Sequence, residues 1–197
     1  GGSNLQALID RARDGSLPAE VVCVISNNST SGALKRARDC EIPAFHISSA
    51  THRDPDARDR AIANALSEHG VELVALCGYM KKLGQETLSR FSPYVLNIHP
   101  ALLPKFGGKG MYGIHVHEAV LAEGKKESGV TVHLVNSNYD EGPILAHRRV
   151  PVRSDDTPET LQTRVLKQEH ELYAEAIAAL ATGKIRIVDG RPTDTLC

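Results

Sequence analysis

The feature that most constrains the fold is the regular alternation of short apolar runs with stretches of helical periodicity. Val21–Ser26, Ala44–Ile47 and Glu72–Tyr79 have the length and apolar character of buried strands. Each is followed by a segment in which apolar residues recur with the spacing of one helix face. This alternation is typical of repeated βα units with parallel strands. We therefore predict an α/β fold, with a doubly wound, mostly parallel, twisted sheet and helices on both faces.

The second half of the chain departs from that pattern. Leu103–Gly113 contains four glycines and a proline, and it is predicted to be a loop. Val130–Val135 and Ile144–Val152 indicate two extended strands around a turn, which form an antiparallel excursion from the sheet. A long helix capped by Thr157 follows, and Lys184–Val188 is predicted as a last strand.

The first residues, Gly1-Gly2-Ser3-Asn4, form a loop that leads into a helix over Asn4–Asp14. In a doubly wound sheet such a loop leaves the end of a buried strand, so we expect a first strand that this sequence does not contain. Ser3 and Gln6, three residues apart, resemble a capping box, and Gly15 suits the position just after the helix.

Composition and charge narrow the class of protein. Hydrophobic residues make up 41% of the 197 and charged residues 24%, as in a soluble globular protein, and the length suits one domain over residues 1–197. The net charge of −1 argues against a nucleic-acid partner. No apolar run is long enough to span a bilayer and no secretory signal is visible, so we predict no membrane partner and a cytoplasmic location. The four cysteines show no metal-ligand spacing, which predicts a site without metal.

The opening loop is the first candidate binding site. Gly1 and Gly2 allow a ligand to approach the backbone closely, and the free N–H groups of a first helical turn favour an anion such as phosphate. Ser3 and Asn4 add side-chain donors. The same residues also suit an ordinary capped helix, so this segment alone leaves both interpretations open.

The second candidate site lies where a predicted strand ends, at Asn97-Ile98-His99-Pro100. Because side chains alternate along a strand, Asn97 and His99 point to one face, and a carboxamide beside an imidazole suits a carbonyl that becomes an oxyanion. A hydrogen-bonded pair that merely ends the strand explains the residues equally well. Asp140 lies in a Gly/Pro turn and His133 in a strand, where each has an ordinary structural interpretation.

Several segments together resemble the glycinamide ribonucleotide formyltransferases, a family of folate-dependent enzymes. The matching segments run in order from residue 1 to about residue 180. They are Gly2-Ser3-Asn4-Leu5-Gln6-Ala7-Leu8, Cys77-Gly78-Tyr79-Met80, Leu96-Asn97-Ile98-His99-Pro100-Ala101-Leu102-Leu103-Pro104, Gly129-Val130-Thr131-Val132-His133, Asp140-Glu141-Gly142-Pro143-Ile144 and Gln168-Glu169-His170.

The resemblance implies the formyltransferase fold and transfer of a formyl group from 10-formyltetrahydrofolate, the co-substrate, to glycinamide ribonucleotide in purine biosynthesis. It implies a catalytic trio of Asn97, His99 and Asp140, in which protonated His99 and Asn97 hold the oxyanion and Asp140 raises the pKa of His99. It also implies that Gly2, Ser3 and Asn4 bind the phosphate of the ribonucleotide and that Glu169 contacts its ribose or glycinamide part. The implied pterin pocket consists of Met80, Lys81, Lys82, Leu83 and Asn97. Arg53 is implied as a further folate contact, and His133 as a support of Asp140.

The same trio also suits other activities. A 10-formyltetrahydrofolate deformylase would use water as the nucleophile, and that family usually carries an additional N-terminal regulatory domain. A methionyl-tRNA formyltransferase would need a C-terminal tRNA-binding domain. A catalytically silent module that binds folate or nucleotide is the alternative from another class. The sequence leaves open whether the protein is a monomer or a homodimer.

Overall fold

The structure is a computed structural model that describes residues 1–197. Its helices and strands alternate through the first half of the chain, as predicted. The helices are α1 (Ser3–Arg13), α2 (Gly32–Asp39), α3 (Pro55–Glu68), α4 (Gln85–Phe91), α5 (Ile114–Ala122) and α6 (Pro158–Ala181). The strands are β1 (Val24–Ser26), β2 (Ala44–His46), β3 (Val74–Leu76), β4 (Val95–His99), β5 (Glu127–Leu134), β6 (Ile144–Pro151), β7 (Ile187–Val188) and β8 (Arg191–Pro192).

The strands pair in the two modes that the sequence indicates. β1 pairs with β2 and β3 with β4, both in parallel, through the βα half of the chain. β4, β5 and β6 are antiparallel neighbours, and the four-stranded sheet has the order β3-β4-β5-β6. The predicted antiparallel excursion is therefore confirmed, and the sheet as a whole is mixed.

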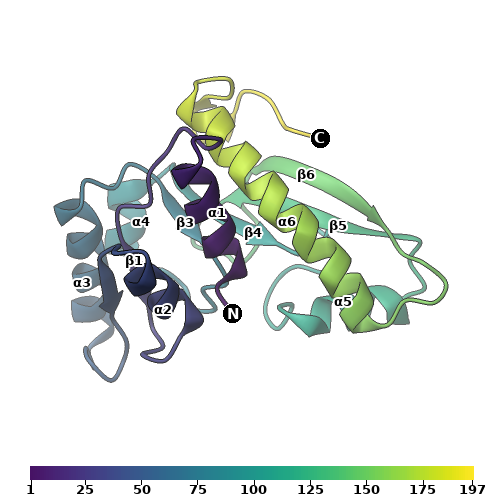
Figure 1. Ribbon diagram of the computed structural model, residues 1–197, viewed down its shortest axis with the longest axis horizontal. Helices are drawn as coiled ribbons and strands as arrows, with labels where there is room; N and C mark the ends of the chain where they lie inside the picture. The colour runs from purple at the N-terminus through teal and green to yellow at the C-terminus, as the bar shows by residue number, and fades with distance from the viewer.

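Helices cover both faces of this sheet, and strand β4 shows how. Val95 of β4 packs with Phe91 in the core beneath α3 and α4. Leu96 and Ile98 belong to the larger core that α6 covers, together with Leu172. Figure 1 shows α6 crossing in front of β5 and β6 with α1 beside it, while α3 and α4 lie to the left. Because Val95 faces α3 and α4, the alternation of β4 directs Asn97 and His99 to that same side.

β1 and β3 each pair with one neighbouring strand only. No ladder joins them, so β1 and β2 form a two-stranded sheet apart from the other four strands. Both strands are three residues long, whereas the apolar runs Val21–Ser26 and Glu72–Tyr79 predicted longer ones. A strand extends only as far as it has a partner, and each of these has a partner on one side only.

One local prediction is wrong. Ser3 and Gln6 make no capping box, because Gly2 is the N-cap with φ 89° and Gln6 instead binds Asp10 and Arg36 through its side chain. The strand predicted over Lys184–Val188 is present in part, as β7, which pairs with β8 in a small hairpin. The cap at Thr157 is confirmed, as a reciprocal capping box with Thr160. No helix combines the length and the apolar character needed to cross a membrane.

Candidate active site

Strand β4 positions the first two members of the predicted trio. Asn97 lies opposite His133 of β5 in the antiparallel register, and His99 lies opposite Thr131. Paired residues share a face of the sheet, so these four polar side chains form one cluster. The alternation that predicted a shared face for Asn97 and His99 is confirmed.

Asp140 completes the cluster from the loop between β5 and β6. Its Oδ1 lies 3.4 Å from the amide nitrogen of Asn97 and 3.5 Å from Nε2 of His133. Its Oδ2 lies 3.7 Å from Nδ1 of His99. The side chains of His99 and Asp140 are 4% and 12% exposed, so the pair is largely shielded from water. The structure therefore brings the predicted trio together, with His133 as a fourth member.

Three glycines surround Asp140 and leave room for it. The backbone N–H of Gly108 donates to Oδ2 of Asp140 at 2.9 Å, and a Cβ on Gly107 would lie 2.5 Å from the side chain of Leu103. On the other side, a Cβ on Gly142 would collide with the carbonyl oxygen of Leu134. Asp140 itself has φ 56°, a left-handed conformation that aspartate tolerates better than most residues. The glycine-rich loop is thus a support for the carboxylate as well as a connection.

The hydrogen bonds also orient the side chains of His133 and Asn97. Nδ1 of His133 lies 2.8 Å from the carbonyl oxygen of Leu134, which accepts only, so the proton is on Nδ1. Nε2 of His133 lies 3.2 Å from the amide nitrogen of Asn97 and 3.5 Å from Oδ1 of Asp140. Because a carboxylate only accepts, it is the nitrogen of the Asn97 amide that faces Oδ1 of Asp140, which fixes the flip of this amide.

Opposing influences set the pKa of His99. Burial lowers the pKa of His99, and His133 adds to this, while Asp140 and the carbonyl of Phe106 oppose it without reversing the direction. Asp140 thus acts on His99 in the predicted direction, but burial outweighs it. Burial acts to raise the pKa of Asp140, but hydrogen bonds from His133 and Gly108 and the neighbouring histidines bring it below the ordinary value. At neutral pH the free protein therefore holds the Asp140 carboxylate beside a neutral His99.

Two features of the surroundings of His99 were not foreseen from the sequence. Its Nε2 donates to the carbonyl oxygen of Phe106 at 2.7 Å, so the donor that an oxyanion would use is already engaged within the protein. His117 of α5 is 1% exposed, its Nδ1 has no partner, and burial together with His99 lowers its pKa to about 4. The spacing of apolar residues could have indicated that His117 is buried, because His117 lies three residues before the buried Val120 on the inner face of a short helix.

Only some of the residues predicted to bind folate line one cleft with the trio. Lys81, Lys82 and Leu83 line a cleft of about 60 Å³ together with Asn97 and the loop 136–140. Met80 is 52% exposed and lies outside that lining, and Arg53 is exposed in the turn before α3.

Lys82 keeps this cleft narrow. Its ammonium donates to the carbonyl oxygen of Ser137 at 2.8 Å and lies 4.8 Å from the centre of the Tyr139 ring. A space of this size holds no more than a few water molecules. The cleft as it stands is therefore too small for a fused two-ring compound.

The predicted phosphate loop meets α6 through a buried pair. The amide of Asn4 donates to Oε2 of Glu169 at 2.7 Å, and Oδ1 of Asn4 is buried without a partner. Burial raises the pKa of Glu169, and the bond from Asn4 opposes that rise. Glycine is needed at position 2 for its φ of 89°, and a Cβ there would lie only 3.0 Å from the backbone nitrogen of Ala33 in α2. The loop thus presents the first turn of α1 beside a buried carboxylate, and no three acidic, histidine or cysteine side chains are grouped to hold a metal.

We expect the substitution Asp140→Asn to lower the pKa of His99 further. The carboxylate is the strongest influence that opposes burial, and asparagine keeps the shape and tolerates the positive φ. An NMR titration of the His99 ring in both proteins measures this shift. Glu118→Gln, which removes a carboxylate from the exposed His115, is the matched control and leaves His99 unchanged. An equal or higher pKa for His99 in Asp140→Asn would contradict this electrostatic role.

Several known proteins are similar to this chain in sequence and fold. A relative from Arabidopsis thaliana, named phosphoribosylglycinamide formyltransferase, chloroplastic, is 42% identical over 187 residues, which cover 94% of this chain. The chain spans 64% of that relative's length. The crystal structure of glycinamide ribonucleotide transformylase 1 from Symbiobacterium toebii matches with a TM-score of 0.89 and 40% identity, covering 97% of this chain and 88% of that one.

A formyltetrahydrofolate deformylase from Pseudomonas syringae shares the fold. Its TM-score is 0.84 at 24% identity, over 98% of this chain and 62% of that one, which shows likeness of fold alone. The family model described as formyl transferase matches residues 1–177, a stretch that contains the opening loop, the trio and Glu169. The chain belongs to the formyl transferase family.

Proposed function

We propose that this chain transfers the formyl group of 10-formyltetrahydrofolate to the amine of glycinamide ribonucleotide. The observation that carries the proposal is the convergence of Asn97 and His99 from β4 and of Asp140 from the loop between β5 and β6 on one shielded spot. The relative from Arabidopsis is named for phosphoribosylglycinamide, which supports this acceptor.

The proposed reaction is a direct acyl transfer. The substrate amine attacks the formyl carbon, a new C–N bond forms, and the carbonyl oxygen becomes an oxyanion. The amide of Asn97 and the Nε2–H of neutral His99 donate to that oxygen, for which His99 must exchange the Phe106 carbonyl for the substrate. The bond from the formyl carbon to the folate nitrogen then breaks, and the proton lost by the amine passes to that nitrogen. Asp140, ionised at neutral pH, is placed to carry this proton.

The two substrates would approach from different sides of the trio. The ribonucleotide phosphate would bind the free N–H groups of Gly2, Ser3 and Asn4 at the start of α1, with Glu169 as acceptor for a hydroxyl or amine. The folate would enter between the loop at Lys82 and the loop at Tyr139, where Lys81, Leu83 and Asn97 line the cleft. Met80 and Arg53, both exposed, remain proposed folate contacts farther out.

A deformylase is the second candidate, because the fold and the trio serve a water nucleophile equally well. The Asn4–Glu169 pair at a helix start favours the transferase, since a deformylase needs no site for a ribonucleotide. A module that binds both ligands without turnover is the third candidate.

One assay separates these functions. The protein is given 10-formyltetrahydrofolate with and without glycinamide ribonucleotide, and formylated ribonucleotide, formate and tetrahydrofolate are measured by mass spectrometry. A transferase forms equal amounts of formylated ribonucleotide and tetrahydrofolate, only when both substrates are present. Formate release without the ribonucleotide would indicate the deformylase, and binding without any product would indicate the silent module.

A further inference from the structure

Asp59 is the only charged residue among those that α3 buries. The helix buries five residues, and the other four are apolar, namely Ile62, Ala63, Ala65 and Leu66. Asp59 itself is 9% exposed. Removing a carboxylate from water is costly unless hydrogen bonds replace the water, so the contacts of this side chain indicate its role.

The Asp59 carboxylate binds the first turn of α4, 27 and 28 residues farther along the chain. The backbone N–H of Glu86 donates to Oδ2 at 2.7 Å. Thr87 is fully buried and donates to Oδ1, through its hydroxyl at 2.5 Å and through its backbone N–H at 3.4 Å. α4 has no cap of its own, because its N-cap is Gly84 and makes no side-chain bond. Asp59 therefore supplies from α3 the acceptor that a capping residue usually supplies at the helix start.

The start of α4 lies directly against this carboxyl group. A Cβ on Gly84 would collide with Cγ and Oδ2 of Asp59. Gly84 has φ −80°, which any residue adopts, so it is the close approach and not the backbone conformation that favours glycine here. A negative charge at this end also interacts favourably with the helix dipole. The contact thus fixes where α4 begins.

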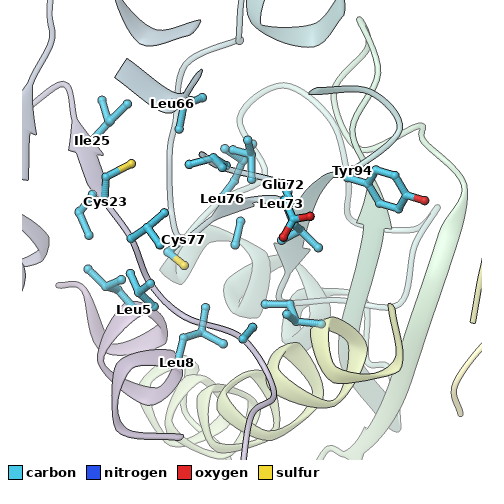
Figure 2. Close-up of a pocket in the computed structure, with 18 of the residues that line it drawn as sticks. Leu5, Leu8, Cys23, Ile25, Leu66, Glu72, Leu73, Leu76, Cys77 and Tyr94 are labelled. Carbon is cyan, nitrogen blue, oxygen red and sulfur yellow. The ribbon is translucent and has the colours of Figure 1, made fainter. Parts of the chain in front are cut away.

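α3 is anchored on the sheet independently of this contact. Leu66 of α3 is buried in the same core as Val95 of β4. Leu66 also lines an apolar pocket together with Leu76 of β3 (Figure 2). The apolar residues of α3 therefore hold the helix in place, and Asp59 joins α4 to this support.

The segment that precedes α4 lines the proposed folate cleft. Three residues of the connection between β3 and α4, Lys81–Leu83, lie along the cleft with Asn97. The pairing of β3 with β4 fixes one end of the connection. At the other end, Leu83 directly precedes the N-cap Gly84, and the bonds to Asp59 hold the first turn. A displacement of this turn therefore displaces a wall of the cleft.

We propose that Asp59 is a positioning residue for the formyl donor: by holding the start of α4 against α3, it keeps Lys81–Leu83 in the arrangement that binds 10-formyltetrahydrofolate. The inference rests on the proposed function for the identity of this ligand. Without the carboxylate, the connection must become ordered when the folate binds, and the cost of that ordering lowers the affinity. The trio is unaffected, because β4 holds Asn97 and His99 and the glycine-rich loop holds Asp140.

The test compares Asp59→Ala with Asn64→Ala in the full chain. Asn64 is exposed on α3 and accepts a hydrogen bond at 2.9 Å from Arg90, in the last turn of α4. It links the same two helices at the end away from the cleft, which makes it the matched control. Steady-state kinetics give kcat and the KM of each substrate, and calorimetry gives the Kd of 10-formyltetrahydrofolate alone. NMR gives the exchange rates of the backbone amides of Lys82 and Leu83.

Asp59→Ala is expected to raise the KM and the Kd for 10-formyltetrahydrofolate about tenfold, which corresponds to about 1.4 kcal/mol and lies in the range for loss of a helix cap. kcat and the KM of the ribonucleotide should stay within about twofold. The amides of Lys82 and Leu83 should exchange faster, because the first turn of α4 opens more often. Asn64→Ala should change none of these quantities.

A second variant covers the case in which Asp59→Ala does not fold, which thermal unfolding detects. Asp59→Asn keeps the shape of the side chain and one of its two acceptor oxygens. It is expected to show the same division between the two substrates, with a smaller rise of about threefold in the KM and Kd for the folate.

Three results would overturn the proposal. Unchanged folate affinity in the folded Asp59 variants would show that the cap does not act on the cleft. An equal loss for both substrates, or a fall in kcat of the same size, would show a general structural role. The same rise in Asn64→Ala would show that any loosening between α3 and α4 has this effect. A protein that forms no formylated ribonucleotide would instead refute the proposed function, and calorimetry and amide exchange would still decide the role of Asp59, because neither depends on turnover.

Discussion

Replacing either His99 or Asn97 by alanine is expected to lower kcat by about 10²–10³. Each substitution would remove one of the two donors proposed for the developing oxyanion, and in a shielded site a donor of this kind contributes about 2.7–4 kcal/mol to the transition state. The KM values should change much less, because the ground-state carbonyl carries little of the charge that these donors stabilise. Steady-state kinetics of formyl transfer measure both parameters.

A matched control separates this loss from a general effect of removing an imidazole. His115 lies on α5, and its side chain is 58% exposed and paired with Glu118, so His115→Ala should retain nearly full kcat. Thermal unfolding of the variants checks that they are folded. Turnover of His99→Ala and Asn97→Ala close to that of His115→Ala would exclude the trio.

Strand alternation made half of this site predictable. The pattern of β4 alone placed Asn97 and His99 on one face, and the pattern of β5 placed His133 with Thr131, because side-chain direction in a strand follows from position. The pairing of these strands then brought Asn97 and His133 opposite each other. Local sequence therefore determined which side chains point to the site.

The position of Asp140 needed information that its own segment does not contain. Its left-handed backbone and its bond from Gly108 depend on two loops, 32 residues apart, meeting over β4. The resemblance to a family pointed to Asp140, whereas a turn of this composition is usually structural.

The charge of His99 depends on burial, which the sequence does not give. Asp140 and desolvation act on the pKa of His99 in opposite directions, and only the structure shows that desolvation outweighs the carboxylate. The predicted lengths of two strands were wrong for a related reason. Val21–Ser26 and Glu72–Tyr79 have strand-forming residues throughout, but a strand requires a neighbour along its full length.

Ser3→Asp is expected to weaken binding of glycinamide ribonucleotide by about 10²-fold and to leave binding of 10-formyltetrahydrofolate nearly unchanged. The substitution places a negative charge in the first turn of α1, where the proposed site holds the phosphate. Loss of a favourable helix-terminus interaction and repulsion between two anions together amount to about 2–3 kcal/mol, and each 1.4 kcal/mol is about tenfold in affinity. Calorimetry with each ligand separately measures the two affinities.

This change is informative because it does not weaken the helix. A negative charge in the first turn interacts favourably with the helix dipole, so Ser3→Asp should be at least as stable as the original protein. Ser3→Asn has nearly the same shape as the aspartate without its charge, and it should bind the ribonucleotide within a few-fold of the original. If Ser3→Asp and Ser3→Asn bind the ribonucleotide equally well, the loop at Gly2 and Asn4 is only a helix start. In that case no bound phosphate positions the substrate amine for attack. Water would then be the simplest nucleophile for the trio, as in a deformylase.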